Sequence, residues 1–181
     1  MDIKPLKLKG SFEIQLHLKG DKRGYFMRSY DGETLAEYGL QTNWVQENQS
    51  LSTRINTIRG LHFLHPPHTE TKLLRCVRGR ILDVFIDLRK DSETFGQWDS
   101  IELSEDNHKS VYVPKGFANG FLTLSKIVLA QYKVDSKYVS EFDDGIRWND
   151  PDVGIDWKIE NPFLSERDKN LQFLADLRSP F

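Results

Sequence analysis

The feature that most constrains the fold of this chain is a series of short apolar runs with a two-residue period, separated by turn residues. Between residues 82 and 88, four aliphatic side chains alternate with Asp83, Phe85 and Asp87. Alternation of this kind predicts a β-strand with one buried face and one face in water. Gly79, between Arg78 and Arg80, predicts a hairpin turn that joins this strand to one over residues 72–77.

Further short strands are predicted along the rest of the chain. Alternating or β-branched runs indicate strands over residues 98–103, 109–113, 121–124 and 128–134, with a turn over Pro114–Gly116. Helix is scarce: Glu33–Tyr38 is a short candidate stopped by Gly39, and Ser165–Leu177 is a longer one that begins at an N-cap serine. With no linker or repeat, we expect one all-β domain over residues 1–181, a sandwich or barrel with a few short helices.

Composition excludes several functional classes. The 181 residues include 25 Lys and Arg against 27 Asp and Glu, a net charge of -2, which disfavours general binding to nucleic acids or acidic membranes. Cys76 is the only cysteine, so no internal disulfide can form and a reducing compartment is expected. The N-terminal residues lack the apolar core of a signal peptide, and no apolar run is long enough to span a bilayer. We therefore expect a soluble, cytoplasmic protein.

The residues most able to carry chemistry lie between Arg59 and Lys72. His62 ends a glycine-containing strand, and a neutral imidazole there can remove a proton from carbon next to a carbonyl. Lys72 or Arg59 can supply positive charge to the oxyanion that then develops. The alternatives are a buried histidine satisfied by backbone hydrogen bonds and a lysine that extends along the strand end to solvent. As a base, His62 would also need an acidic partner to orient it.

Three more residues have both a structural and a functional interpretation. Tyr132 shares a strand face with Val128, Ala130 and Val134, so it is either a core residue or a phenol able to donate a proton at the mouth of a barrel. Tyr138 lies in a polar stretch and is a second candidate or a surface anchor. Asp168 stands three residues after Ser165, the spacing of a helix capping box.

A metal site is the competing interpretation of the histidine-rich stretch. His62, His65 and His68, with Glu70 beside them, are residue types that bind zinc or iron. Residues three apart fall on opposite faces of a strand, and Pro66-Pro67 forces irregular backbone between two of the histidines. We therefore expect no metal, and expect His65 and His68 to lie in a solvated loop.

Several motifs occur in a fixed order along most of the chain. They are Arg23–Phe26, Val45–Ser50, Ile58–Phe63, Lys72–Arg75, Val77–Gly79, Asp83–Arg89, Pro114–Ala118, Gly145–Trp148, Asp152–Trp157 and Leu164–Asp168. Together they resemble the dTDP-4-dehydrorhamnose 3,5-epimerase family, and their number and order make the resemblance specific.

The resemblance implies a cupin-type jelly-roll barrel, a homodimer, and an isomerase that uses neither metal nor cofactor. The implied substrate is a nucleotide-linked 4-keto-6-deoxy sugar. The expected reaction converts dTDP-4-dehydro-6-deoxyglucose to dTDP-4-dehydrorhamnose in deoxysugar and polysaccharide biosynthesis. Three alternatives stay open: a single-centre epimerase acting on a CDP-linked or other deoxy sugar or a 6-deoxyheptose, a metal-dependent cupin enzyme, and a sugar-binding barrel without catalytic activity.

The resemblance also assigns roles to individual residues. His62 would be the base that removes the proton next to the keto group, with Asp168 as its acidic partner. Lys72 would stabilise the enolate oxygen, and Tyr132 would deliver a proton to the opposite face of the sugar. The expected substrate-binding residues are Arg23, Phe26, Arg28, Gln46, Asn48, Arg59, Asn119, Tyr138 and Asp143. In a homodimer of this kind, Arg23 and Arg28 would reach the partner's site.

Two positions depart from the pattern of the family. The run that starts at Pro114 usually continues from Ala118 to a histidine, but here it continues to Asn119. Asparagine can form hydrogen bonds but cannot carry a proton. The segment after Gly24 usually ends in a glutamate that faces the base of the nucleotide, where this chain has Arg28. A guanidinium only donates hydrogen bonds, which suits the acceptors of cytosine better than the N3–H of thymine.

Overall fold

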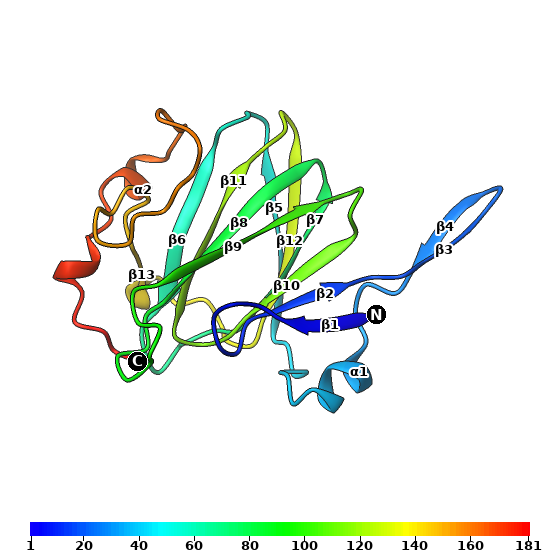
Figure 1. Ribbon diagram of the computed structural model, residues 1–181, viewed down its shortest axis with the longest axis horizontal. Helices are drawn as coiled ribbons and strands as arrows, with labels where there is room; N and C mark the ends of the chain where they lie inside the picture. The colour runs from blue at the N-terminus through cyan, green and yellow to red at the C-terminus, as the bar shows by residue number, and fades with distance from the viewer.

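The computed structural model describes residues 1–181, and its fold is almost entirely β (Figure 1). The only α-helices are α1 (Gly32–Glu37) and α2 (Glu166–Lys169), with short 3-10 helices at Ser140–Phe142 and Leu174–Asp176. The strands are β1 (Asp2–Pro5), β2 (Phe12–Gln15), β3 (Leu18–Asp21), β4 (Gly24–Met27), β5 (Gln46–Ser52), β6 (Ile58–Leu64), β7 (Lys72–Arg78), β8 (Arg80–Asp87), β9 (Trp98–Ser104), β10 (Lys109–Val113), β11 (Phe117–Thr123), β12 (Val128–Val134) and β13 (Asp143–Gly145).

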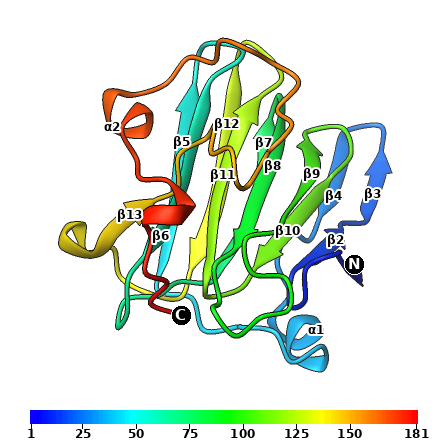
Figure 2. The same ribbon diagram turned by 60° about the vertical axis from the view of Figure 1, so that its left-hand side comes forward.

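The strands form two antiparallel sheets that face each other, as in a cupin-type jelly roll (Figures 1 and 2). One sheet has the strand order β1-β2-β10-β7-β12-β5, and the other has the order β13-β6-β11-β8-β9. Strands β3 and β4 form a separate two-stranded ribbon, which projects away from the two sheets (Figure 1). The predicted all-β fold class, a jelly-roll barrel with a few short helices, is therefore confirmed.

The predicted hairpin at Gly79 is wrong. Strand β7 pairs with β10 and β12 of the six-stranded sheet, whereas β8 pairs with β11 and β9 of the other sheet. Gly79 turns the chain from one sheet into the other with φ of +80°, and a Cβ atom there would lie 2.2 Å from the carbonyl oxygen of Ile127. The local pattern predicts the turn, but the partner of each strand depends on contacts that are distant in sequence.

The core between the sheets consists of side chains that alternate inward from both. They include Leu74 and Cys76 of β7, Phe85 of β8, Val111 of β10 and Phe117 of β11. Tyr132 packs against this cluster, so its predicted inward direction is confirmed. Burial of these side chains, at about 25 cal/mol for each Å² of apolar surface, holds the two sheets together.

A second apolar cluster lies on the outer face of the five-stranded sheet, beneath the C-terminal segment. Val84 and Ile86 of β8 pack there with Ile146, Val153 and Trp157. Strand β8 is consequently buried on both faces, and the prediction that one face meets water is wrong: Asp83 and Asp87 are both fully buried. The aliphatic face of β8 is covered by the chain after residue 145, whereas the face of Asp83, Phe85 and Asp87, which the pattern assigns to solvent, lies in the core between the two sheets.

The first predicted helix is confirmed, and the second is confirmed only in part. Helix α1 is capped by the Asp31 side chain and ends before Gly39. In the C-terminal segment, Ser165 caps α2 as predicted, but that helix ends at Lys169. A bridge between Gln172 and Ile146 draws the chain back to the barrel, so Ser165–Leu177 is not one continuous helix. Tertiary contacts outweigh helical propensity here.

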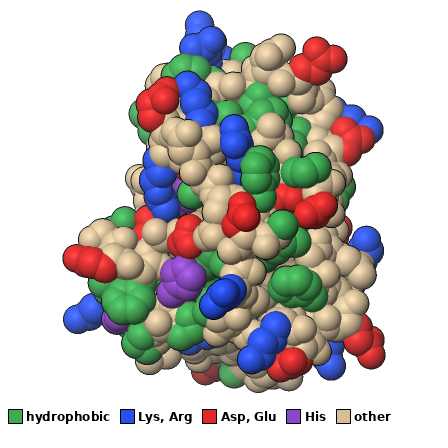
Figure 3. Space-filling model, turned by 90° about the vertical axis from the view of Figure 1, so that its left-hand side faces the viewer, with side chains coloured by type: hydrophobic (Ala, Val, Ile, Leu, Met, Phe, Trp, Pro, Cys, Tyr) green, Lys and Arg blue, Asp and Glu red, His purple; other side chains and the backbone are tan.

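The remaining predicted strands agree closely with β9, β10, β11 and β12, although β11 begins at Phe117 rather than at residue 121. No helix is long and apolar enough to cross a membrane. On the face that carries the C-terminal segment, basic and acidic side chains are interspersed, without an extended patch of either sign (Figure 3).

Candidate active site

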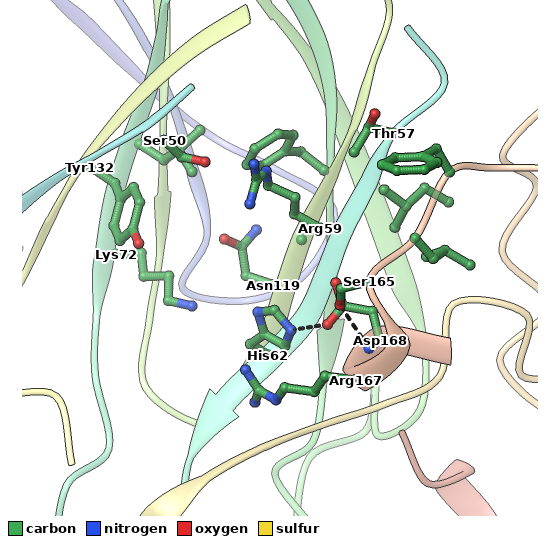
Figure 4. A pocket seen from close by; sticks show the side chains of 16 residues that line it. Ser50, Thr57, Arg59, His62, Lys72, Asn119, Tyr132, Ser165, Arg167 and Asp168 are labelled. Carbon is green, nitrogen blue, oxygen red and sulfur yellow. Dashed lines mark hydrogen bonds and ion pairs between the residues drawn. The ribbon is translucent and has the colours of Figure 1, made fainter. Parts of the chain in front are cut away.

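Six of the predicted site residues line a cavity of about 480 Å³ between the sheets and the C-terminal segment: Arg59, His62, Lys72, Asn119, Tyr132 and Asp168 (Figure 4). One wall is the six-stranded sheet, and the opposite wall is β6 and β11 of the other sheet. The cavity is lined by Ser50, Thr57, Ile58, Arg59, His62, Lys72, Leu74, Asn119, Gly120, Phe121, Tyr132, Phe163, Leu164, Ser165, Arg167 and Asp168. A mixed apolar and polar lining of this volume suits a small-molecule ligand.

His62 and Asp168, 106 residues apart in sequence, are joined by a hydrogen bond in the cavity. The His62 Nε2 atom lies 2.7 Å from Oδ1 of Asp168, whose side chain is only 7% exposed. A carboxylate accepts hydrogen bonds, so this contact places the ring hydrogen on Nε2 and leaves the Nδ1 lone pair free. The ring nitrogen not bound to Asp168 lies on the cavity side (Figure 4). The arrangement is that of an oriented general base.

Local structure brings Asp168 to this position. Ser165 Oγ accepts a hydrogen bond from the backbone N–H of Asp168, so the predicted cap exists. The carboxylate itself turns the other way, toward His62 and the backbone N–H of Gly60. Despite burial, these hydrogen bonds hold the pKa of Asp168 below its ordinary value. Asp168 therefore serves as both a capped helix residue and the partner of His62, and it stays ionised at neutral pH.

Gly60 permits β6 and β11 to approach closely beneath His62. Its φ is +119°, and a Cβ atom there would lie 2.7 Å from the Cα atom of Gly120 and 2.9 Å from the carbonyl oxygen of Asn119. Only glycine fits such a position. The glycine noted in the sequence thus sets how His62 enters the cavity.

Lys72 approaches from the opposite wall. Its Nζ atom lies 3.1 Å from Oε1 of Glu70, and its side chain is 13% exposed. Burial favours the neutral amine, but Glu70, with further contributions from Tyr132 and Asp83, outweighs it and raises the pKa of Lys72. Lys72 is consequently a charged ammonium group fixed by Glu70, rather than a lysine whose side chain extends to solvent. Tyr132, on the adjacent strand β12, lines the same wall (Figure 4).

Asn119 faces His62 across the β6–β11 pair and is 5% exposed. Its Nδ2 atom donates to Oδ2 of Asp83 at 2.9 Å and to the backbone oxygen of Val84 at 3.2 Å. Asp83 contacts Asn119 but does not line the cavity itself. Burial raises the pKa of Asp83 to about 8, although the hydrogen bond from Asn119 and the Lys72 charge oppose this shift. Asp83 is a residue near the site that the sequence analysis did not select, because its place on β8 indicated a solvent-facing acid.

Two guanidinium groups line the cavity. Arg59 Nε donates to Oγ of Ser52 at 3.0 Å, and Nη2 donates to the backbone oxygen of Leu51 at 3.1 Å, which leaves Nη1 without a protein acceptor. Arg167 lies beside His62 and forms an ion pair with Asp143 at 2.8 Å. The sequence analysis missed Arg167. Its position immediately before Asp168 was the available signal, since the same helical turn that delivers Asp168 delivers its neighbour.

Four of the predicted binding residues lie near the cavity but do not line it. Gln46 and Asn48 alternate with Ser50 on one face of β5, and Ser50 does line the cavity. Gln46 Oε1 accepts from the backbone N–H of Tyr138, and the Tyr138 hydroxyl donates to Asp143 at 2.9 Å. The Asp143 carboxylate raises the pKa of Tyr138. Asp143 also pairs with Arg167, so this group is connected to the cavity wall.

Three predicted binding residues are remote from this cavity. Arg23 and Phe26 belong to the β3–β4 ribbon, and Arg28 follows it (Figure 1). Arg23 pairs with Asp21 and Arg28 pairs with Asp31, all within the same part of the chain. Phe26 is 64% exposed. The three side chains therefore do not line the cavity of their own chain.

The histidines considered as metal ligands have separate partners. His65 Nε2 lies 2.9 Å from Oδ2 of Asp144, His68 packs against the ring of Phe142, and Glu70 pairs with Lys72. His65 and His68 lie in the loop after β6, as predicted, but both are half-buried rather than fully solvated. No group of three or more His, Cys, Asp or Glu side chains is placed to hold a metal ion.

The chain is similar to known epimerases that act on nucleotide-linked sugars. Residues 5–176 match the family model for dTDP-4-dehydrorhamnose 3,5-epimerase. The chain is 43% identical to the enzyme of that name from Methanothermobacter thermautotrophicus over 172 residues, covering 93% of this chain and 92% of the relative. It is also 34% identical to a dTDP-4-dehydrorhamnose 3-epimerase from Streptomyces niveus, covering 98% of this chain and 86% of the relative.

A solved structure gives the same result at the level of the fold. The crystal structure of dTDP-4-dehydrorhamnose 3,5-epimerase from Bacillus anthracis, with TDP and PPi bound, superposes with a TM-score of 0.93 at 42% identity. The match covers 96% of this chain and 99% of that one. The chain, an isomerase with a jelly-roll fold, belongs to the dTDP-4-dehydrorhamnose 3,5-epimerase family.

Proposed function

We propose that this protein epimerises the sugar of dTDP-4-dehydro-6-deoxyglucose at C3 and C5, giving dTDP-4-dehydrorhamnose. The observation that carries the proposal is the placement of His62, held by Asp168, on one wall of the cavity, and of Lys72 and Tyr132 on the other. The relative from Bacillus anthracis binds TDP, which supports a thymidine nucleotide as the carrier of the sugar.

The first step of the proposed mechanism is proton removal. His62 Nδ1 takes the proton from the carbon next to the keto group, and the Asp168 carboxylate stabilises the imidazolium that forms. The electron pair moves onto the keto oxygen, where the Lys72 ammonium stabilises the enolate. Glu70 keeps this ammonium charged and fixed in the cavity.

The second step is proton return from the other side of the ring. The Tyr132 phenol lies on the wall opposite His62, so its proton reaches the face of the sugar from which His62 did not remove one. A proton lost on one face and gained on the other inverts the carbon. Each general acid or base in such a step contributes about 10²- to 10⁴-fold to the rate.

The nucleotide end is proposed to lie at the mouth of the cavity. Arg59 has an uncommitted Nη1 atom for the diphosphate, and a guanidinium binds phosphate oxygens in a bidentate manner. Gln46, Asn48, Tyr138 and Asp143, along the same rim, are proposed to contact the nucleoside or sugar. Asn119 is proposed to contact the sugar directly.

We further propose a homodimer in which the β3–β4 ribbon of one copy reaches the cavity of the other. This would give Arg23, Phe26 and Arg28 the binding role that they cannot fill in their own chain. The exposed aromatic side chains of Tyr25 and Phe26 on the ribbon support an interface there. A reducing, cytoplasmic location, consistent with the lone buried Cys76, is part of the same proposal.

Mixed dimers test the shared site. A dimer of one Arg23→Ala chain and one His62→Ala chain contains one cavity with both native residues. Activity in the mixture above that of either variant alone would support the proposal, whereas a monomer in light scattering or a strictly additive mixture would refute it.

The second candidate is a single-centre epimerase, with the sugar on CDP or another nucleotide. Asn119 in place of the usual histidine and Arg28 in place of the usual glutamate favour it, and the 3-epimerase relative supports the existence of single-centre activity in this family. Proton NMR in deuterated water, with dTDP- and CDP-linked 4-keto-6-deoxyglucose in parallel, separates the two. Loss of both the C3 and C5 signals with dTDP supports the first candidate, and loss of one signal, or turnover with CDP alone, supports the second.

A further inference from the structure

The side-chain amide of Asn119 is held in one orientation by two acceptors. Its Nδ2 atom carries two hydrogens, and these reach Oδ2 of Asp83 and the backbone oxygen of Val84. A backbone carbonyl can only accept, so the nitrogen must be the atom that faces Val84, whatever the protonation state of Asp83. The Oδ1 atom receives no hydrogen bond from the protein and points into the cavity (Figure 4).

A role in stabilising the fold does not explain the environment of the Asp83 side chain. Its side chain is completely buried, and Oδ1 has no hydrogen-bond partner. A buried carboxyl group with an unpaired oxygen is costly, and such groups concentrate at functional sites. The two groups that act on Asp83 are both cavity residues, Asn119 by a hydrogen bond and Lys72 by its charge.

We propose that Asp83 is a positioning residue that fixes Asn119 as a pure hydrogen-bond acceptor for the 3-hydroxyl of the sugar. This inference rests on the proposed function and refines its substrate class. The Asn119 oxygen repels a keto or enolate oxygen, since neither carries a proton, but it accepts from a hydroxyl group. The keto oxygen is therefore left to Lys72 alone.

The position of the hydroxyl follows from the groups that flank Asp83. Lys72 and Asn119 both interact with this one carboxyl group, so their polar ends are close enough to bind neighbouring atoms of one ligand. In a 4-keto-6-deoxy sugar, the carbons next to the keto carbon carry a hydroxyl at C3 and a methyl at C5. With the C4 oxygen at Lys72, the neighbouring oxygen that Asn119 can accept from is the 3-hydroxyl.

The test measures binding of sugar nucleotides that cannot react. Calorimetry would give the Kd of dTDP-glucose, dTDP-3-deoxyglucose, dTDP-2-deoxyglucose and dTDP for wild type, Asn119→Ala, Asp83→Asn and Asp83→Val, or of the CDP series if wild type turns over only CDP sugars. Asn119→Ala should weaken dTDP-glucose by about 3- to 10-fold, the usual worth of one hydrogen bond. It should leave the 3-deoxy sugar and dTDP itself unchanged.

The two Asp83 variants separate positioning from a merely structural role. Asparagine at 83 still offers an oxygen to Asn119 Nδ2, so Asp83→Asn should bind dTDP-glucose as wild type does. Asp83→Val removes the acceptor and should reproduce the Asn119→Ala loss for dTDP-glucose but not for dTDP. A folded Asp83→Val protein, judged by its thermal transition, with unaltered dTDP-glucose affinity would overturn the inference.

The same data distinguish failure of this inference from failure of the proposed function. Suppose that wild type binds dTDP-glucose, but that removing the 3-hydroxyl weakens binding by the same factor in wild type and in Asn119→Ala. That result would overturn only the inference. The inference would also be overturned if the effect of Asn119→Ala disappeared with dTDP-2-deoxyglucose rather than with dTDP-3-deoxyglucose. Failure of wild type to bind any of these sugar nucleotides would overturn the proposed function, and the inference with it.

Discussion

Asp168→Asn is the substitution whose effect can be worked out most fully from the structure. Asparagine has nearly the same shape, and the helix cap uses the backbone N–H of residue 168, so the cap to Ser165 stays. What changes is the charge 2.7 Å from His62 Nε2. The amide cannot stabilise the imidazolium, and its nitrogen competes to place a donor where the ring needs an acceptor.

The magnitude follows from the interaction between the carboxylate and the imidazolium. Opposite charges about 4 Å apart near a protein surface interact by about 4 kcal/mol, and a charge-assisted hydrogen bond is worth about 1.5–3 kcal/mol. A loss of about 2–4 kcal/mol in the transition state lowers the rate about 30- to 1,000-fold, at about 1.4 kcal/mol for each tenfold.

The assay is deuterium incorporation from solvent at C3 and C5 of the 4-keto sugar, followed by NMR under single-turnover conditions. The matched control is Asp144→Asn, which alters a similar pair with His65 outside the cavity and should leave the rate unchanged. The dTDP affinity of Asp168→Asn should stay at the wild-type level, because the altered charge faces His62. Deuterium incorporation by Asp168→Asn at the wild-type rate would refute the assignment of Asp168 as the partner of the base.

Three further predictions test other parts of the account. Lys72→Met should lower kcat about 10²- to 10³-fold, as removal of one oxyanion donor does in other enzymes, and a kcat equal to wild type would remove Lys72 from the mechanism. Asp83 has a folded-state pKa of about 8 against 3.8 for the ordinary group, so the folded protein binds the extra proton and its unfolding free energy should fall as pH rises from about 4 to 8. Asp83→Asn should flatten that slope in urea titrations, and an identical slope in both proteins would contradict the buried neutral acid. Gly60→Ala should destabilise the fold by about 3 kcal/mol or more, because its Cβ atom meets the β11 backbone at positive φ, and wild-type stability in the same titration would contradict the close approach.

The sequence predicted the strands and the chemistry better than it predicted partners. The alternation over residues 82–88 correctly indicates β8, but it cannot tell that β8 and β7 lie in different sheets. Nor can it tell that the chain after Gly145 covers the outer face of β8, which leaves Asp83 on the other face, buried between the two sheets. These facts depend on contacts between residues far apart in sequence. That residues 1–181 fold as one domain stays a prediction.

The site divides in the same way. His62 and Lys72 were recognisable from their local setting, and Asp168 only through the resemblance, since its spacing from Ser165 equally indicates a cap. The structure joins both interpretations, because the capped turn is what delivers the carboxylate to His62. Arg167 was missed because a basic residue in a polar helical turn ordinarily faces solvent. Arg23, Phe26 and Arg28 remain predictions, as their proposed role requires a second copy of the chain.

The most direct test of the central claim is to separate catalysis from binding at His62. The measurement compares wild type and His62→Asn for deuterium incorporation into the 4-keto sugar, with the Kd of the sugar nucleotide determined on the same samples. The account predicts that incorporation at every exchangeable centre falls by about 10²- to 10⁴-fold while the Kd is unchanged, since His62 contributes a base rather than binding. Incorporation at the wild-type rate would show that another group removes the proton and would contradict the proposed mechanism.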